Sequence, residues 1–247
     1  MTEELHDVLA EQKQYYEARA QEYDEWFYRH GRYNRGDVHT QQWLAEIEVV
    51  RHALRTANLT GHVVDIAAGT GIWTQELLKT ADHVTAIDSA TEMLDFNRQK
   101  LQSNKVSYVA TDLFYWQPVV AYDAAFMGFW LSHVPLSQLY EFIGTVAGAL
   151  QPGGKVFFVD SLLEPTSMAS DHDFETLSQQ VQTFGVSQSK QIKVRRRLND
   201  GREFDIVKVF YDPHDLVERF GSHNLPVTVK KTENFFLYGW GTKVNGD

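Results

Sequence analysis

The stretch from His62 to Trp73 constrains the fold of this chain more than any other. An apolar run ends at Asp65, small residues follow at 67–71, and the pattern then becomes that of a helix. A buried parallel strand that leads into a tight turn and a helix has this pattern. Small residues matter because a ligand can approach the backbone only where no side chain intervenes. Ligands of open α/β sheets bind beyond the carboxyl ends of the strands, so we expect the binding site at or near this turn.

Strand and helix patterns alternate along the middle of the chain. Besides the opening strand, the patterns predict strands at 84–88, 106–110, 122–130 and 155–160 and helices at about 38–57, 90–101 and 136–150. Strands separated by helical patterns are typical of βαβ units, in which a parallel sheet has helices on both faces. We therefore predict an α/β fold.

Two segments outside this alternation are interpreted as a lid and an insertion. Residues 2–28 have the pattern of one or two amphipathic helices. Residues 161–190 are polar, with one weak helical pattern at Phe174, Leu177, Val181 and Phe184. The runs 192–198 and 204–210 flank an Asp-Gly pair, which is a strong short-range signal for a β-hairpin.

The end of the chain returns to the sheet pattern. Asp212 is a suitable N-cap for a short helix to Phe220, and two strand-like runs follow at 227–231 and 235–240. We divide the chain into an N-terminal helical lid at 1–37, a ligand-binding core at 38–160, an inserted cap at 161–210, and a closing helix with the last two strands of the core at 211–247.

Composition and charge exclude several classes of function. The formal net charge is −10, whereas nucleic-acid binding needs a basic face, so we expect no nucleic-acid partner. The chain has no cysteine and its ten histidines are scattered, so we expect no metal site. The acidic start is unlike a signal peptide, and no run approaches the roughly 18 apolar residues of a membrane span. We expect a soluble, cytoplasmic protein without a membrane partner.

Three acids follow three successive predicted strands. Asp65 closes the first strand, and Asp88 closes the second, about 20 residues after Gly69, where dinucleotide-binding folds place an acid on a ribose diol. Asp112 follows the third strand and could accept from an adenine amino group, while Met93 could pack on the adenine face. Each acid alone could equally be a helix N-cap. Together they predict a nucleoside site.

These residues resemble the motifs of the class I S-adenosylmethionine-dependent methyltransferases. Residues 65–71, Asp-Ile-Ala-Ala-Gly-Thr-Gly, are similar to the family's acid-x-Gly-x-Gly-x-Gly motif, with Ala67 in place of the first glycine. Residues 88–94 and 111–113 resemble its second-strand and third-strand motifs, and residues 150–155 resemble its turn before the fifth strand. Four matches in the family's order make the resemblance specific.

The resemblance covers residues 38–160 and the closing strands, and it implies a fold, a cofactor and site residues. The implied fold is a Rossmann-like, seven-stranded, mostly parallel sheet whose last strand is antiparallel. The implied cofactor is S-adenosylmethionine, and the implied activity is methyl transfer to a small molecule. The implied cofactor-binding residues are Tyr16, Tyr23, Asp65, Ala67, Gly69, Gly71, Trp73, Asp88, Ser89, Met93, Asp112, Leu113, Gly128 and Phe129.

A dinucleotide is the main competing ligand for the loop. NAD and FAD proteins need Gly-x-Gly-x-x-Gly, whose third glycine would stand at Thr74 here. Asp65 would repel a pyrophosphate, whereas it would attract the ammonium group of a methionine moiety. The charge of the loop therefore favours S-adenosylmethionine over the cofactor of an NAD-linked oxidoreductase.

The end of the fourth strand should line the gap between the cofactor and the methyl acceptor. It reads Gly128-Phe129-Trp130, unlike the Asn/Asp-Pro-Pro-aromatic sequence of methyltransferases that act on amino groups of bases or glutamine. His133 follows at a place where it could act as a general base, since its unperturbed pKa is close to the operating pH. The alternative is that His133 caps the next helix or hydrogen-bonds the lid.

The Tyr-rich N-terminal segment resembles the entry helix of small-molecule methyltransferases, whose tyrosines close over the sulfonium end of the cofactor. Tyr16 and Tyr23 would share one helix face, and we assign Tyr16 to the catalytic group together with His133. Ordinary helix packing is the alternative for both tyrosines. With the insertion, nearby aromatic residues would form an acceptor pocket for a planar or apolar molecule; they are Trp26, Phe27, Tyr28 and Tyr33.

The basic residues leave an acidic acceptor as a further possibility. Arg29, Arg32 and Arg35 lie in the lid loop, and residues 195–197 form a run of three arginines on the hairpin. Both clusters could make bidentate contacts with an acid. Alternate residues of a charged strand usually face water, so we expect solvent exposure for at least two of the hairpin arginines.

The combined prediction is methyl transfer from S-adenosylmethionine to an oxygen or nitrogen nucleophile of a small aromatic or apolar metabolite. The reaction would be an in-line displacement that depends mainly on positioning. A quinone-type C-methyltransferase and a non-methylating S-adenosylmethionine-binding protein are the alternatives. We expect a small-molecule acceptor as the partner and a monomer or homodimer.

Overall fold

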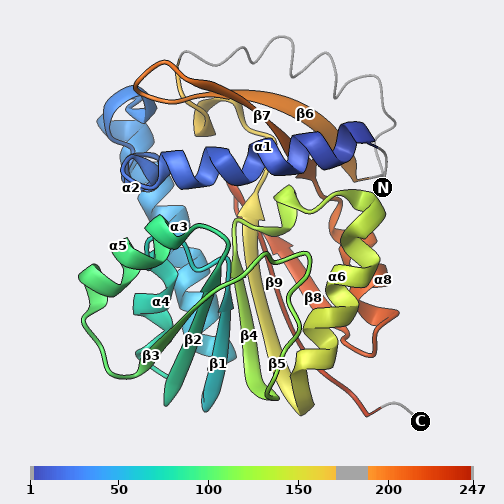
Figure 1. The fold of residues 1–247 in the computed structure, drawn as a ribbon. Helices are drawn as coiled ribbons and strands as arrows, with labels where there is room; N and C mark the ends of the chain where they lie inside the picture. The colour runs from blue at the N-terminus through green and yellow to red at the C-terminus, as the bar shows by residue number, and fades with distance from the viewer. Residues whose placement is uncertain (1–2, 171–188, 246–247) are drawn as a thin grey trace.

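The computed structural model describes residues 3–170 and 189–245, and the helical pattern expected at Phe174 to Phe184 lies outside them. A seven-stranded sheet forms the centre of the molecule (Figure 1). Its strands, in spatial order, are β3 (Val106–Ala110), β2 (His83–Asp88), β1 (His62–Ile66), β4 (Tyr122–Gly128), β5 (Leu150–Ser161), β9 (Phe236–Thr242) and β8 (Val227–Lys231). β1 to β5 pair in parallel, and β9 is antiparallel to both β5 and β8. The predicted mostly parallel, seven-stranded sheet is confirmed.

Helices cover both faces of the sheet, and neighbouring residues of a strand point to opposite faces. α3 (Asp37–Ala57) and α4 (Ile72–Leu77) pack on one face with Phe126 and Phe157. α6 (Leu136–Ala149) and α8 (Pro213–Gly221) pack on the other face with Met127 and Phe158. α5 (Thr91–Leu101) lies beside β2 and β3. Because side chains alternate along a strand, the apolar run of β4 contributes to two hydrophobic cores at once.

The lid and the inserted cap lie over one end of the sheet (Figure 1). The lid consists of α1 (Glu3–Arg19), α2 (Tyr23–Tyr28) and the short 3-10 helix η1 (Gly31–Tyr33). The described part of the cap contains the 3-10 helix η3 (Pro165–Ser167) and a two-stranded antiparallel sheet of β6 (Lys190–Arg197) and β7 (Glu203–Phe210). In this view α1 crosses between the main sheet and the hairpin.

The predicted hairpin forms and packs against α1. Its turn contains Gly201, whose φ of 90° lies in the region that glycine adopts easily. Tyr15 of α1 packs in one cluster with Ile192, Val194 and Ile206 of the hairpin. Because an isolated two-stranded sheet is marginally stable in water, the hairpin depends on this contact with α1 and on the contacts of β7 with η2.

β4 is shorter than the sequence predicts. It ends at Gly128 instead of Trp130, because Phe129 has a φ of 59°, in the left-handed region, which ends the extended backbone. The chain then forms the 3-10 helix η2 (Leu131–His133). This early turn brings His133 back over the end of the sheet.

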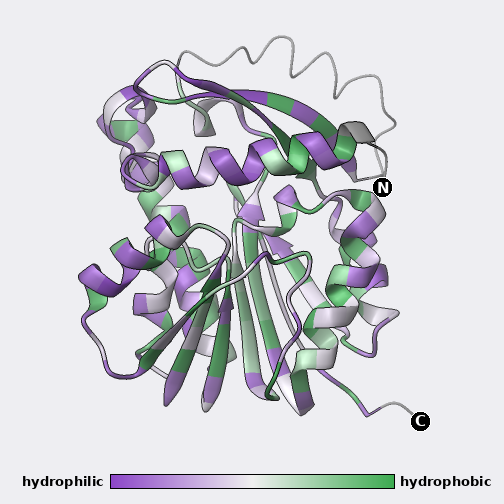
Figure 2. Ribbon diagram, in the orientation of Figure 1, coloured by the Kyte–Doolittle hydropathy of each residue, from purple (hydrophilic) through white to green (hydrophobic). Residues whose placement is uncertain are grey.

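Hydrophobic residues concentrate in the central strands, and hydrophilic residues dominate the outer faces of the helices (Figure 2). Within residues 3–170 and 189–245, no helix combines the length and apolarity needed to cross a bilayer. In the same ranges, no group of three or more His, Cys, Asp or Glu side chains is arranged to hold a metal ion.

Candidate active site

The loop between β1 and α4 has a backbone that small residues adopt most easily. Ala67, Gly69 and Gly71 have positive φ angles of 59°, 53° and 87°. Glycine accepts such angles readily, whereas an L-residue in the left-handed helical region is destabilised by roughly 1–2 kcal/mol. A Cβ at Gly71 would lie 2.7 Å from the side chain of Asn97. Glycine at position 71 is therefore required by the close approach of Asn97, and glycine at position 69 relieves backbone strain in the turn from strand to helix.

Asp88 at the end of β2 holds this loop. Its Oδ2 accepts a hydrogen bond from the Gly69 N–H at 2.9 Å, and its Oδ1 accepts one from the Ala90 N–H at 2.9 Å. Burial raises the pKa of the carboxyl to about 6, while these hydrogen bonds act to lower it. Each carboxylate oxygen has a second lone-pair site, so Asp88 can hold the loop and accept from a ligand hydroxyl at once.

A chamber of about 30 Å³ in front of the loop brings together most of the predicted cofactor-binding residues. A groove of about 630 Å³ adjoins it, and Asp112 lines this groove. The residues that line the chamber are Tyr16, Tyr23, Ala67, Gly69, Asp88, Ser89, Met93, Leu113, Gly128, Phe129 and, in addition, Trp130. We name it the cofactor chamber.

Asp65, Gly71 and Trp73 do not line the cofactor chamber. The Asp65 carboxyl points to α4, where its Oδ2 accepts from the Thr74 hydroxyl at 2.6 Å, and burial raises its pKa to about 7. Trp73 packs behind Gly128, where a Cβ would lie 2.8 Å from the indole ring. These positions shape the loop and the wall of the chamber from behind.

A second chamber, of about 60 Å³, lies between α1, the hairpin and η3. It shares Tyr16, Tyr23 and Phe129 with the cofactor chamber, and Tyr16 also lines the groove. The rest of its wall consists of Tyr15, Arg19, Trp26, Tyr33, His133, Ser161, Leu162, Leu163, Glu164, Ser167, Met168, Arg196, Ile206, Lys208 and Phe210. We name it the acceptor chamber, because a molecule there would adjoin the contents of the cofactor chamber.

Positive side chains outnumber negative ones in the acceptor chamber. Arg19, Arg196 and Lys208 line it, and Glu164 is the one carboxylate among the described lining residues. Arg19 is 8% exposed and stacks on two tyrosine rings, and its terminal nitrogen donates to the Tyr33 hydroxyl at 3.5 Å. Its Nε is buried and has no hydrogen-bond partner within the described parts of the chain. Because burying a charge is costly without a partner, this wall is suited to an anion.

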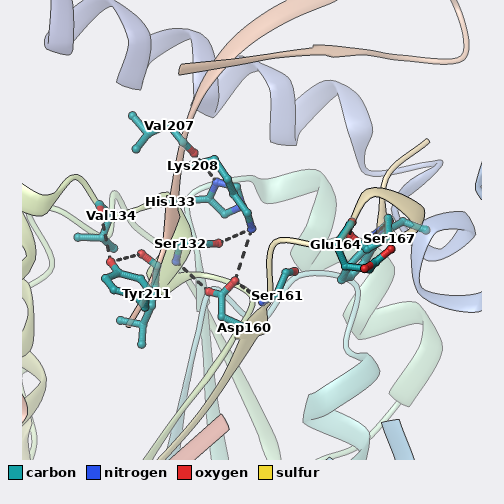
Figure 3. A network of polar contacts seen from close by, with 12 residues as sticks. Ser132, His133, Val134, Asp160, Ser161, Glu164, Ser167, Val207, Lys208 and Tyr211 are labelled. Atoms are coloured by element: carbon teal, nitrogen blue, oxygen red, sulfur yellow. Dashed lines mark hydrogen bonds and ion pairs between the residues drawn. The ribbon is translucent and has the colours of Figure 1, made fainter. Parts of the chain in front are cut away.

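Lys208 on β7 belongs to a buried polar network (Figure 3). Its Nζ donates to the Ser132 hydroxyl at 2.7 Å and lies 3.5 Å from Asp160 Oδ1. Asp160 also accepts from the backbone N–H groups of Ser132 at 2.8 Å and Ser161 at 2.7 Å. Burial lowers the pKa of Lys208, and the Asp160 carboxylate opposes this shift. The network connects the hairpin to η2 and to the end of β5.

Both ring nitrogens of His133 are hydrogen-bonded. Nδ1 lies 2.9 Å from the Val207 carbonyl oxygen (Figure 3), and Nε2 lies 2.7 Å from the Tyr16 hydroxyl. A carbonyl oxygen only accepts, so Nδ1 carries the proton and Nε2 accepts from Tyr16. Burial, followed by the charge of Lys208, holds the pKa of His133 well below its usual range. His133 is therefore neutral and in direct contact with Tyr16.

The lid-loop arginines do not line the acceptor chamber. Arg29 is buried and donates to two carbonyl oxygens of η3 at 2.6 Å and 2.9 Å, and desolvation lowers its pKa to about 10. Arg35 donates to the Met168 carbonyl at 3.4 Å, and Arg32 lies 3.5 Å from Glu22. These side chains are engaged within the lid and between the lid and η3.

Of the three hairpin arginines, Arg196 alone lines the acceptor chamber. It lies on the inner face of β6 with the apolar residues of that strand, because side chains alternate along it. Arg195 and Arg197 are exposed, and Arg195 pairs with Asp205 on β7 at 2.9 Å. The expected exposure of two hairpin arginines is confirmed.

Sequence reasoning did not single out Gln12, Arg19, Asp160 and Lys208. Asp160 carried a usable signal, because it closes the strand predicted at 155–160, as Asp65 and Asp88 close their predicted strands. Arg19 and Lys208 carried none, since nothing local distinguishes a basic residue that faces a chamber from one that faces water. Gln12, whose Nε2 donates to the His133 carbonyl oxygen at 3.1 Å, carried none either.

Comparison with known proteins identifies similar structures over the whole chain. A family model described as a methyltransferase domain matches residues 63–154. DhpI in complex with SAH is 32% identical, with a TM-score of 0.75 over 98% of this chain and 99% of that chain. A complex of DhpI with SAM and HEP is 34% identical, with a TM-score of 0.76 over 96% and 98% of the two chains. No curated protein sequence matches this chain.

A more distant structure shares the fold. The N-methyltransferase NodS from Bradyrhizobium japonicum WM9, in complex with S-adenosyl-L-homocysteine, is 14% identical, with a TM-score of 0.59. The alignment covers 94% of this chain and 98% of NodS. The architecture therefore extends well beyond the range of clear sequence similarity.

Proposed function

The chain belongs to the class I S-adenosylmethionine-dependent methyltransferases, and from this we propose that it methylates an oxygen or nitrogen nucleophile of a small oxyanion. One observation carries the proposal. The chamber beside the glycine loop meets a chamber lined by three cations, and Tyr16, Tyr23 and Phe129 belong to both. A methyl donor and an anionic acceptor would come together at these three side chains.

In this proposal the cofactor occupies the cofactor chamber and part of the adjoining groove. Asp88 accepts from the ribose hydroxyls, and Asp112 in the groove accepts from the adenine amino group. Bound S-adenosylmethionine supplies an electrophilic methyl group on a positively charged sulfur. The rings of Tyr16 and Tyr23 favour this sulfonium, because the face of an aromatic ring attracts a cation.

Charge supports an anionic acceptor. The sulfonium would add a further positive charge beside Arg19, Arg196 and Lys208, and like charges repel strongly where water is excluded. A carboxylate or phosphoryl group would offer oxygens to the guanidinium of Arg19, whose Nε is buried without a hydrogen-bond partner in the described parts of the chain. Asp160 already pairs with Lys208 and accepts from two backbone N–H groups, so an external anion would chiefly serve Arg19.

Size supports a compact acceptor. The acceptor chamber has a volume of about 60 Å³, and one water needs roughly 10–15 Å³ on the same measure, so it holds on the order of five groups of that size. Of the four aromatic residues that suggested a planar acceptor, Trp26 and Tyr33 line the chamber, whereas Phe27 and Tyr28 do not. The small volume and the cations of the chamber favour a small oxyanion over an aromatic metabolite or a quinone-type acceptor of carbon methylation.

The pair of Tyr16 and His133 is suited to remove the proton of the nucleophile. Tyr16 lines the acceptor chamber, and its proton already points to His133 Nε2. Bound S-adenosylmethionine would supply the methyl carbon, and its sulfur would keep the electron pair of the broken carbon–sulfur bond. The Tyr16 oxygen would accept the nucleophile's proton and pass its own proton to His133 Nε2. Burial and Lys208 disfavour a positive charge on this ring, and the simultaneous loss of the sulfonium charge would offset that cost. Holding the nucleophile in line with the methyl carbon and the sulfur would supply the rest of the rate acceleration of methyl transfer.

Anion binding provides a test that does not require the acceptor to be known. We expect SAH-loaded protein to bind inorganic phosphate or acetate in isothermal titration, and Arg19→Met to weaken this binding by about tenfold or more, because a charge-assisted hydrogen bond is lost. The matched control is Arg195→Met on the exposed face of the hairpin, which should bind as the wild type does. Equal binding by Arg19→Met and wild type would rule out the oxyanion site.

Turnover distinguishes an enzyme from a non-methylating binding protein. The protein is incubated with S-adenosylmethionine and a panel of small hydroxy or amino compounds. Some compounds carry a carboxylate or a phosphoryl group, and their matched counterparts carry a neutral amide instead of the anionic group. We expect release of SAH with anionic members of the panel and not with their amide counterparts. Binding of SAH without turnover on any member would favour the non-methylating alternative.

A further inference from the structure

We propose that Gln12 is a positioning residue of the methyl-transfer site. It joins the lid helix and the cap hairpin to His133, so that the imidazole keeps its proton on Nδ1 and Tyr16 meets Nε2. The consequence for catalysis rests on the proposed function of the Tyr16–His133 pair, whereas the orientation of the ring does not. Gln12 lines the groove, but it lines neither the cofactor chamber nor the acceptor chamber. Both polar atoms of its amide are hydrogen-bonded to Val207 and His133, so we assign its influence on the reaction to His133.

Three hydrogen bonds link Gln12, His133 and Val207 in a closed ring. Gln12 Nε2 donates to the His133 carbonyl oxygen at 3.1 Å. The Val207 N–H donates to Gln12 Oε1 at 3.1 Å. His133 Nδ1 donates to the Val207 carbonyl oxygen at 2.9 Å (Figure 3). The ring therefore joins α1, η2 and β7 at one point.

Position 12 requires a side chain that both donates and accepts. The Val207 N–H can only donate and the His133 carbonyl can only accept, so an amide with the orientation seen here satisfies both groups. The Gln12 side chain is 3% exposed, and water cannot readily replace either bond. An apolar side chain of similar size would leave two buried polar groups without partners, which is unfavourable.

The free edge of the hairpin explains why Val207 is available. β7 pairs with β6 along one edge, so backbone groups on its other edge need partners elsewhere. Glu11 accepts from the Asp205 N–H at 2.7 Å in the same way. Because Glu11 keeps α1 attached to β7, replacing Gln12 should disturb the surroundings of His133 without detaching the lid.

Gln12 also positions the side chain of Tyr16 relative to His133. The two residues are about one helical turn apart on α1, so they lie on the same face of the helix. Holding Gln12 against η2 and β7 sets the height of the helix above His133. At that height the Tyr16 hydroxyl lies 2.7 Å from His133 Nε2.

The test compares Gln12→Met with Gln14→Met, an exposed glutamine on the same helix. There are three readouts: the ¹⁵N chemical shifts of the His133 ring, the Kd for SAH, and kcat with an acceptor from the anionic panel. The His133 signals are assigned by their absence from the spectrum of His133→Gln. Wild type and Gln14→Met should show a protonated Nδ1 and an unprotonated Nε2. In Gln12→Met both shifts should move toward the values of exchanging tautomers. We expect kcat to fall about tenfold or more and the Kd for SAH to change less than about twofold.

An unchanged pair of ¹⁵N shifts in Gln12→Met, or an unchanged kcat, would overturn the proposal. If Gln12→Met does not unfold cooperatively in thermal denaturation and is therefore misfolded, Gln12→Glu takes its place. Glutamate retains an acceptor for the Val207 N–H but offers no donor to the His133 carbonyl, and the same readouts apply. If the wild type methylates no acceptor, the proposed function fails, while the ¹⁵N shifts still decide whether Gln12 orients His133.

Discussion

At the scale of single residues, the site depends on backbone conformations that most side chains disfavour. Ala67 and Phe129 both have φ angles of 59°, and both line the cofactor chamber. Such residues persist where the surrounding structure holds them, and they are concentrated at functional sites. The Phe129 N–H donates to the Val159 carbonyl at 2.8 Å, which fixes the turn where the two chambers meet.

Ala67 provides a test of this strain. Ala67→Gly should raise the free energy of unfolding by a few tenths to about 1 kcal/mol, because relief of the left-handed alanine exceeds the entropy that glycine loses on folding. The neighbouring Ala68, which has no positive φ, is the matched control. Ala68→Gly should lower stability instead, and urea denaturation of both variants measures the difference. A loss of stability in Ala67→Gly equal to that in Ala68→Gly would contradict the account.

At the scale of elements, α1 contributes to every part of the proposed reaction. Gln12, Tyr16 and Arg19 recur at about one-turn intervals and so share one face of the helix. That face contacts η2, the acceptor chamber and the cofactor chamber. A lid that only excluded water would need no such set of polar side chains. This helix therefore supplies part of the lining of both chambers.

The closing helix α8 has the N-terminal cap that the sequence predicts. Asp212 Oδ1 accepts from the His214 N–H at 2.9 Å, and Pro213 occupies the first turn. Asp212→Ala should lower the free energy of unfolding by about 1 kcal/mol, because a helix N–H loses its partner. His214→Ala, which removes an exposed side chain but keeps the capped N–H, should change it by less than about 0.5 kcal/mol. Thermal denaturation distinguishes the two, and equal shifts in Tm would argue against the cap.

At the scale of the whole molecule, the buried Asp65 makes stability depend on pH. Burial raises its pKa from 3.8 to about 7, so between these values the folded protein holds a proton that the unfolded chain lacks. Stability from this group is complete below about pH 4 and is lost as the pH rises through about 7. Asp65→Asn, which can still accept from Thr74, removes the dependence.

The measurement compares wild type and Asp65→Asn by urea denaturation at pH 5 and pH 8. The difference in the free energy of unfolding, variant minus wild type, should be larger at pH 8 than at pH 5 by on the order of 2 to 3 kcal/mol. Other titrating groups, including His133 with its opposite shift, are common to both proteins and cancel in the difference. A relative stability that is the same at both pH values would refute the raised pKa of Asp65.

The sheet, the glycine loop and the strand-end Asp88 were predictable because each depends on neighbours in the sequence. Alternation of apolar residues fixes the faces of a strand, and small residues fix a turn with positive φ. Asp65 was predictable as a strand-end acid, but the direction of its carboxyl toward α4 was not. That direction depends on the face of β1 to which its side chain belongs.

The acceptor chamber and the orientation of His133 were decided by the tertiary structure. Arg19, Arg196 and Lys208 come from three separate elements, and nothing local indicates that they face one another. Gln12 and Val207 are hydrogen-bonded across 195 residues of sequence. The sequence by itself determined the class of fold and the cofactor, because local patterns and ordered motifs encode both. The charge and size of the acceptor chamber depend on which faces of the lid and the hairpin meet, and only packing in three dimensions determines that.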